Sequence, residues 1–120
     1  MKIVKKKNIR IIDFTKEKYE NDELFDLGYS TEFLEHVEEK YMDNYFDTFK
    51  KCKYVFCTYA PKGKGGYHHV NTQDEDYWIN KFHQFNFSFE KDKSRSIRLS
   101  STINKNFVRN HGLLFKNNSF

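Results

Sequence analysis

The sequence predicts a single α/β domain with a largely parallel sheet covered by helices. Three observations predict it. Strand-like and helix-like segments alternate along the chain. The segment 54–59 is apolar at nearly every position, as in a strand buried on both faces. A chain of 120 residues suffices for one hydrophobic core, and its 13 phenylalanines and 8 tyrosines predict an aromatic core.

Two strands and a helix are predicted in the first half of the chain. Residues 8–13 alternate and then turn apolar, which favours a strand that ends at Asp13. Residues 24–29 form a second short apolar run. Apolar residues then recur at three- and four-residue steps from about 32 to 51, which predicts a helix with Thr31 as its N-cap.

The second half begins with the strand at 54–59, which ends at the glycine-rich loop 60–66. Thr72 and Glu75 then fit a capping box, which opens a helix to about Gln84. This helix is expected to bury its apolar side chains, which are Trp78, Ile79 and Phe82.

The last thirty-five residues carry weaker patterns. Residues 86–90 alternate like a strand. Residues 93–106 are ambiguous and are expected to be helical in part. Residues 107–115 are predicted to be a closing strand with a break at His111-Gly112.

Charge and composition exclude several classes of protein. The net charge of +4 is spread over several short basic runs, without the interleaved aromatics of a nucleic-acid-binding surface. No apolar run approaches the roughly 20 residues that span a bilayer, and Met1–Lys7 lacks the apolar stretch of a secretory signal. We therefore expect a cytoplasmic protein, with Cys52 and Cys57 reduced and partly buried.

Two segments resemble class I S-adenosylmethionine-dependent methyltransferases. Residues 25–37, FDLGYSTEFLEHV, resemble the "FDL…EvlEHv" run of the family's fourth strand and following helix. Residues 65–71, GGYHHVN, with Tyr77–Ile79 and Phe82, resemble a "GGxHHvN…YWi…F" stretch after the fifth strand. The resemblance covers roughly residues 8–115.

The resemblance implies a partial Rossmann-like methyltransferase sheet with its first two strands missing. The strand at 8–13 would be the third. The family's glycine-rich cofactor turn should precede Asn8, where only seven residues stand. The glycines of 63–66 do not replace it, because they follow the wrong strand. The fourth strand would then have an unpaired edge, which invites pairing with another chain.

The resemblance also implies roles for single residues, which form four groups. Asp13 would contact the cofactor's adenine, and Ser30, Thr31 and Glu32 would line its methionine end. His36, His68 and His69 are candidate bases. Tyr67, Asn71 and Trp78 are candidate contacts of the acceptor substrate. Methyl transfer needs mainly positioning, and a base is needed only when the acceptor must lose a proton.

Several of these residues have a purely structural alternative. Asp13 could close an ordinary turn, Glu32 could serve a helix dipole and Trp78 is expected more often in a core than on a substrate. His36 is as compatible with packing as with a site. Adjacent histidines in a strand-like stretch point to opposite faces, so no metal is expected at His68-His69.

The sequence therefore predicts methyl transfer from S-adenosylmethionine to a small molecule such as a sugar or another metabolite. The alternative is a non-catalytic remnant, or the partner-binding half of a split methyltransferase, which a companion chain or a homo-oligomer would complete. An upstream segment of the natural protein would be a third explanation. No nucleic acid or membrane partner is expected, and the isolated chain should bind the cofactor weakly or not at all. These predictions require strand ends near residues 13, 31 and 61 to share one rim.

Overall fold

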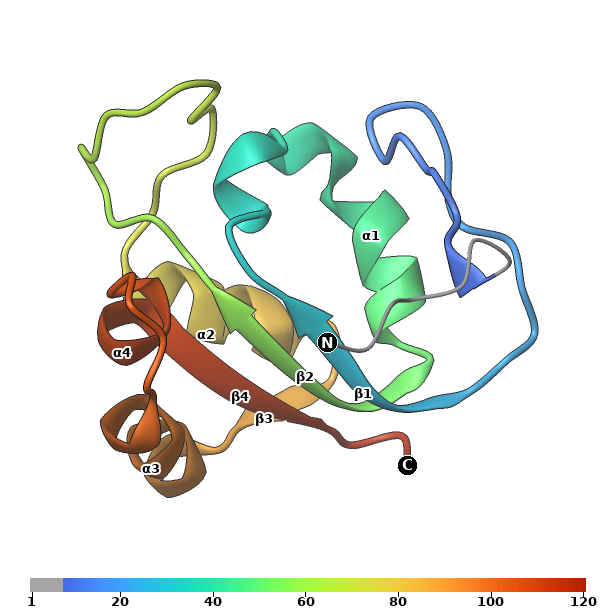
Figure 1. Ribbon diagram of the computed structural model, residues 1–120. Helices are drawn as coiled ribbons and strands as arrows, with labels where there is room; N and C mark the ends of the chain where they lie inside the picture. Colours follow the sequence, from blue (N-terminus) through green and yellow to red (C-terminus); the bar gives the residue numbers. More distant parts are fainter. Residues whose placement is uncertain (1–7) are drawn as a thin grey trace.

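The computed structural model describes residues 8–120, and Met1–Lys7 with its basic run lies outside the described residues. The order of elements confirms a coarse α/β fold (Figure 1). The elements are β1 (Phe25–Ser30), the 3-10 turns η2 (Leu34–His36) and η3 (Glu39–Tyr41), α1 (Met42–Phe49), β2 (Cys52–Thr58), α2 (Glu75–Gln84), β3 (Phe87–Phe89), α3 (Lys91–Ser100), α4 (Phe107–His111) and β4 (Gly112–Asn117).

The sheet is mixed, with the strand order β1-β2-β4-β3. β1 and β2 run parallel, whereas β4 runs antiparallel to both of its neighbours. The expectation of a largely parallel sheet was therefore wrong. α3 and α4 carry the chain back to the end of the sheet where β2 finishes, so that β4 starts with Gly112 opposite Thr58 and must run the other way.

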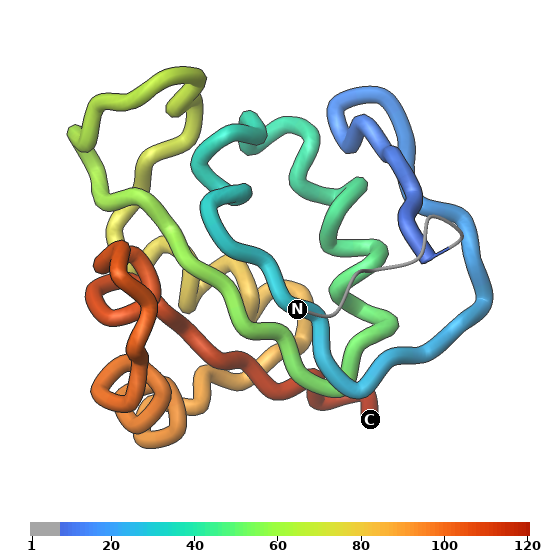
Figure 2. The backbone as a smooth tube through the Cα atoms, in the orientation of Figure 1, coloured from blue at the N-terminus to red at the C-terminus, as the bar shows by residue number. Residues whose placement is uncertain are grey.

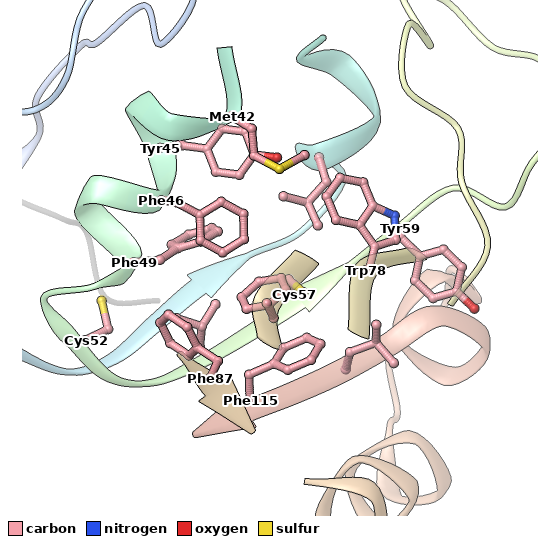
Figure 3. Packing of buried hydrophobic residues seen from close by; sticks show 14 of the residues in the cluster. Met42, Tyr45, Phe46, Phe49, Cys52, Cys57, Tyr59, Trp78, Phe87 and Phe115 are labelled. Carbon is pink, nitrogen blue, oxygen red and sulfur yellow. The ribbon is translucent and has the colours of Figure 1, made fainter. Parts of the chain in front are cut away.

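One face of the sheet is covered by α1 and α2 and carries an aromatic core. We name it the α1–α2 face. Phe82 of α2 stacks on Phe115 of β4 with ring centroids 3.8 Å apart, and Phe46 of α1 meets Phe82 edge-on at 4.7 Å. Figure 3 shows Phe46 above Phe87 and Phe115, with Trp78 beside them. Trp78 and Phe82 are fully buried, as predicted, and the expectation of an aromatic core is confirmed.

The opposite face, next to α3 and α4, carries a smaller hydrophobic cluster. We name it the α3–α4 face. Phe56, Val108 and Leu114 form its buried part, while Val55 and Cys57 point to the opposite face. β2 is therefore buried on both faces, as its apolar run predicted. Both cysteines are free, as expected, and they are almost completely buried rather than partly buried.

The predicted strand at 8–13 does not form, and residues 9–24 contain no strand. Side chains rather than a ladder hold this segment. The ring of Phe14 packs edge-on against Phe33 and Tyr45, and Asn44 Nδ2 donates to the carbonyl of Phe14 at 2.7 Å. Asp13 instead accepts hydrogen bonds from Thr15 within its own turn.

The predicted helix over 32–51 was wrong in its first ten residues. The regular α-helix begins only at Met42, after the two 3-10 turns, so Thr31 is no N-cap. A helix through this segment would need the carbonyl of Glu35 for its own ladder. That carbonyl accepts instead from the backbone N–H groups of Val70 and Asn71, at 2.9 and 3.0 Å. Leu34 is nevertheless fully buried, as the apolar periodicity of this segment predicted.

The capping box at Thr72 was also wrong. α2 begins at Glu75 with Asp74 as its N-cap residue, and no side chain caps it. The carboxylate of Asp74 accepts instead from the backbone N–H of Lys62 at 3.1 Å, which ties the preceding loop to the helix start.

The closing strand was predicted five residues too early. Residues 107–111 form α4, and β4 begins at Gly112, where the break was expected. The guanidinium of Arg98 donates to the carbonyls of Arg109 and Asn110 at 2.9 and 2.6 Å, and so satisfies the end of this short helix. The ambiguous stretch at 93–106 is partly helical, as α3 shows. Across residues 8–120 no helix has the length and apolar character needed to span a bilayer.

Candidate functional site

The carboxyl ends of the parallel strands β1 and β2 lie side by side and form a rim. Ser30 pairs with Cys57 in the ladder, and the backbone N–H of Glu32 donates to the hydroxyl of Thr58 at 2.8 Å. This is the edge of an α/β sheet where ligands bind. Two of the three predicted strand ends therefore share one rim. The third is missing because residues 8–13 form no strand, although Phe14 packs on the rim residue Phe33.

The loop between β2 and α2, residues 59–74, folds back over the segment that follows β1 (Figure 2). The two backbone bonds to Glu35 fix this contact. Within the loop, the N–H of His69 donates to the carbonyl of Gly66 at 3.3 Å, which closes a tight turn. His68 occupies this turn with φ 57°, a left-handed conformation that is strained for a side chain other than glycine.

This fold-back brings together a buried carboxylate and two imidazoles, which we name the Glu35–His36–His69 cluster. Each residue offers one ligand atom, and the three atoms all lie within 4.8 Å of one another. The imidazole rings of His36 and His69 meet edge-on with centroids 5.0 Å apart. Glu35 is only 4% exposed, and its Oε1 has no hydrogen-bond partner among residues 8–120.

Backbone carbonyls orient both imidazoles of the cluster. Nδ1 of His36 lies 3.0 Å from the carbonyl oxygen of His68, and Nδ1 of His69 lies 3.3 Å from that of Lys64. A carbonyl oxygen can only accept, so each Nδ1 carries the proton. In the neutral form of each ring, Nε2 is then the nitrogen that carries the lone pair.

The three predicted catalytic histidines are therefore not equivalent. His36 and His69 lie together, whereas the exposed ring of His68 packs edge-on against Tyr67. His68 acts on the cluster through its backbone, because its carbonyl orients His36.

The predicted cofactor residues also divide. Ser30 and Thr31 line a cavity of about 360 Å³ between β1, α1 and Phe14, and the buried hydroxyl of Ser30 has no partner among the described residues. Asp13 and Glu32 do not line this cavity. Hydrogen bonds from the hydroxyl and the N–H of Thr15 lower the pKa of Asp13, whose carboxylate is thus engaged in its own turn.

The predicted substrate contacts lie in three different environments. Tyr67 is 89% exposed at the tip of the loop. Asn71 is buried, and its Oδ1 accepts from Gln73 Nε2 at 3.3 Å. Trp78 has no exposed surface and packs in the core, so it follows the structural alternative and offers no platform to a substrate.

Sequence reasoning missed Glu35 and Gly66. Glu35 belongs to an acidic stretch that reads as the first turn of a helix, and only the returning loop buries it. Gly66 matters because a Cβ there would lie 2.6–2.8 Å from three ring atoms of His69. The available signal was the pairing of an EH dipeptide with an HH dipeptide thirty-three residues later.

Comparisons of the chain with protein-family models, with curated proteins and with solved structures found no match. A function can therefore be inferred only from the rim, its cavity and the resemblance of the two sequence segments.

Proposed function

We propose that the rim binds the methionine end of S-adenosylmethionine and that this domain takes part in methyl transfer to a small molecule. The observation that carries the proposal is the meeting of Ser30 and Thr31 in one cavity at the carboxyl end of β1. The cavity volume of about 360 Å³ falls within the range of small-molecule sites, roughly 300–1,000 Å³. The buried, unpaired hydroxyl of Ser30 is a group that a polar ligand would satisfy.

The proposed reaction requires mainly that this chain position the reactants. Methyl transfer is an in-line displacement, and most of its acceleration comes from holding the acceptor against the sulfonium methyl group. The loop 59–74 stands beside the rim and carries His69, whose Nε2 has a free lone pair. Nε2 of His69 or of His36 would take a proton from an acceptor hydroxyl or amine that comes within hydrogen-bond reach.

A glycine-rich turn that opens a helix and would hold the adenosine is not found among residues 8–120. The carboxylate of Asp13 is engaged by Thr15, and the glycines of 63–66 do not open a helix. We propose that the missing contacts join the domain at β1, which has no strand on its outer side among the described residues.

A second candidate function is that of the partner-binding half of a split methyltransferase, or of a non-catalytic remnant. The exposed apolar residues on β1 favour it. Leu27 and Tyr29 are 53% and 60% exposed and line an apolar groove of about 510 Å³ next to the free edge. An added strand would satisfy this edge, and its side chains would cover the groove.

Binding of S-adenosylmethionine to the full chain, followed by ¹H–¹⁵N chemical shifts, tests the first candidate. We expect a dissociation constant weaker than about 1 μM and the largest shifts at residues 30–32. Ser30→Ala should weaken binding further, whereas the control Ser96→Ala, at an exposed serine of α3, should leave it unchanged. Shifts that avoid the rim, or no shifts with the cofactor at about 1 mM, would refute the proposal.

Sedimentation of the full chain over a range of concentrations tests the second candidate for a homo-oligomer. We expect self-association that Leu27→Lys abolishes and that Leu24→Lys, at a more exposed leucine just before β1, preserves. If the chain remains monomeric, the companion must be a different polypeptide. If both variants associate like the wild type, the face over Leu27 is not the interface.

A further inference from the structure

We infer that Glu35, His36 and His69 form a binding site for one divalent transition-metal ion, for which Zn²⁺ is the ion to test. The inference rests on the placement of the three side chains and does not depend on methyl transfer. The three ligand atoms already lie within 4.8 Å of one another. Around a metal ion with bonds of about 2.0–2.2 Å, ligand atoms lie roughly 3–3.5 Å apart. A contraction of about 1 Å would close the site.

The buried carboxylate is the independent sign of a ligand. Glu35 is almost completely buried, and its Oε1 has no hydrogen-bond partner in the described part of the chain. Burial of a carboxylate without a partner is costly, so buried carboxylates pair with cations or coordinate metals. A metal ion held between Glu35 and the two imidazoles would satisfy this oxygen.

Hydrogen bonds to backbone carbonyls orient the two histidines in the way that is common for histidines that bind metals. In metal sites the ligating imidazole donates its other N–H to a carbonyl or a carboxylate, which fixes its tautomer. Nδ1 of His36 and Nδ1 of His69 each lie next to a backbone carbonyl oxygen, so both Nε2 atoms are left to ligate. The expectation of no metal considered only His68 with His69. The second imidazole comes from His36, thirty-three residues earlier.

The turn around Gly66 is shaped for the ring of His69. A Cβ at Gly66 would lie 2.6 Å from Cε1 and 2.8 Å from both ring nitrogens of His69. The strained His68 completes the turn and aims its carbonyl at His36. The backbone bonds from Val70 and Asn71 to Glu35 join the loop to the other two ligands. The backbone thus holds the three ligands near one another before any ion binds.

The ligand set indicates which ions the site takes. Two imidazoles and one carboxylate suit Zn²⁺ and its first-row neighbours, whereas Mg²⁺ and Ca²⁺ prefer oxygen ligands. Three protein ligands leave at least one position open on the ion, as in catalytic rather than structural zinc sites. His36 and His69 are half-buried and lie near the exposed loop, so water or a substrate oxygen can reach that position.

The first experiment is calorimetric titration of the full, tag-free chain with Zn²⁺, with Mg²⁺ as the comparison ion. We expect one Zn²⁺ per chain with a dissociation constant of about 1 μM or tighter, and much weaker binding of Mg²⁺. His36→Ala, His69→Ala and Glu35→Gln should each lower the affinity at least about 100-fold. His83→Ala removes an exposed histidine of α2 and should change nothing.

A pair of glycine variants tests the geometry without touching a ligand. Gly66→Ala should lower the Zn²⁺ affinity about 10–100-fold, because its Cβ displaces the ring of His69. Gly65→Ala is the matched control, since a Cβ there meets nothing within 4 Å, and it should bind Zn²⁺ like the wild type. Equal affinities of the two variants would contradict the proposed place of His69.

A readout on the wild type keeps the inference falsifiable if a variant fails to fold. X-ray absorption of the Zn²⁺-loaded chain should show two imidazole nitrogens and one carboxylate oxygen in the coordination shell. A shell that contains sulfur or fewer than two imidazoles would overturn the assignment. So would the absence of Zn²⁺ binding at about 100 μM, or binding that survives all three ligand substitutions.

Discussion

The two faces of the sheet differ in how completely the chain covers them. On the α1–α2 face, rings from two helices and two strands interlock, and Phe82 and Phe115 are fully buried. On the α3–α4 face, only a three-residue cluster is buried, and Leu27 and Tyr29 of β1 stand exposed beside a groove of about 510 Å³. Both faces belong to the same four strands, so the strands themselves do not explain the difference.

The cause lies in the position of the helices. α1 and α2 follow β1 and β2 and return over the whole width of the sheet, whereas α3 and α4 pack mainly against β4 and each other. β1 therefore has a covered face, an uncovered face and a free edge. Substitutions on the covered face should therefore mainly lower the free energy of unfolding, and substitutions on the uncovered face should mainly change association with another chain. The four predictions below measure that separation.

The largest loss of stability is expected from Phe82→Ala. Phe82 is fully buried, stacks on Phe115 and meets Phe46 edge-on, so its loss leaves a cavity in the middle of the α1–α2 face. Urea unfolding should show a loss of about 3–5 kcal/mol. The control Phe120→Ala removes a half-exposed ring at the end of the chain and should cost about 0.5 kcal/mol or less. Comparable losses from both variants would contradict the packing described here.

One substitution made on both faces compares them directly. Leu113→Ala removes a fully buried side chain from the α1–α2 face and should cost about 2–5 kcal/mol. Leu27→Ala removes the same atoms from the open groove and should cost less than about 1 kcal/mol. Chemical denaturation of both variants gives the difference. A large cost at Leu27 would mean that something covers the groove in solution.

Ser94→Ala tests what holds α3 to the sheet on the α3–α4 face. The buried hydroxyl of Ser94 donates to the carbonyl of Glu90 at 2.6 Å and accepts from the backbone N–H of Leu114 at 2.8 Å. Its removal leaves the buried N–H of Leu114 without an acceptor, so the free energy of unfolding should fall by about 1–3 kcal/mol. Amide exchange at Leu114 should accelerate. Ser96→Ala, on the exposed side of α3, should leave both measurements unchanged.

The smallest effect is expected at the polar margin of the α1–α2 face. The hydroxyl of Tyr77 donates to Glu39, and the ammonium of Lys81 lies 3.1 Å from it; these contacts lower the pKa of Glu39 below its ordinary value of 4.5. The contribution of Glu39 is therefore complete above that value and is lost as the pH falls through the lower, folded-state pKa. Glu39 is largely exposed, so the contribution should stay below about 1 kcal/mol.

Thermal unfolding from pH 7 to pH 3 checks this prediction through Glu39→Gln. The variant should unfold at a slightly lower temperature than the wild type at pH 7, and the difference should vanish toward pH 3. Glu38→Gln, whose carboxylate lies 3.6 Å from the ammonium of the exposed Lys40, is the matched control and should show a smaller difference. A gap between wild type and Glu39→Gln that widens as the pH falls would contradict the assigned sign.

Local patterns identified most elements but not how they pair. The apolar run around Val55, the alternation at Phe87–Phe89 and the periodicity around Trp78 each predicted the right kind of element, because burial of these side chains follows from period alone. The segment 8–13 has a strand-like pattern but no partner strand. A strand exists only in a ladder, and the ladder depends on distant residues.

The candidate site shows the same limit. His36 and His69 were singled out individually from their two motifs. Ser30, Thr31 and Glu32 were expected to line the methionine end of a cofactor, and of these Ser30 and Thr31 line one cavity whereas Glu32 does not. The grouping of the two histidines with Glu35 was not predictable, because a helix was expected where the carbonyl of Glu35 bonds to the returning loop.

The sequence by itself determined an α/β domain with an aromatic core and a polar loop after its most apolar strand, because side-chain period and apolar content act over a few residues. Only the tertiary structure decided that β4 runs antiparallel, that β1 keeps a free edge and that a buried carboxylate meets two imidazoles. Those features depend on contacts between residues thirty or more positions apart, which local periodicity cannot encode.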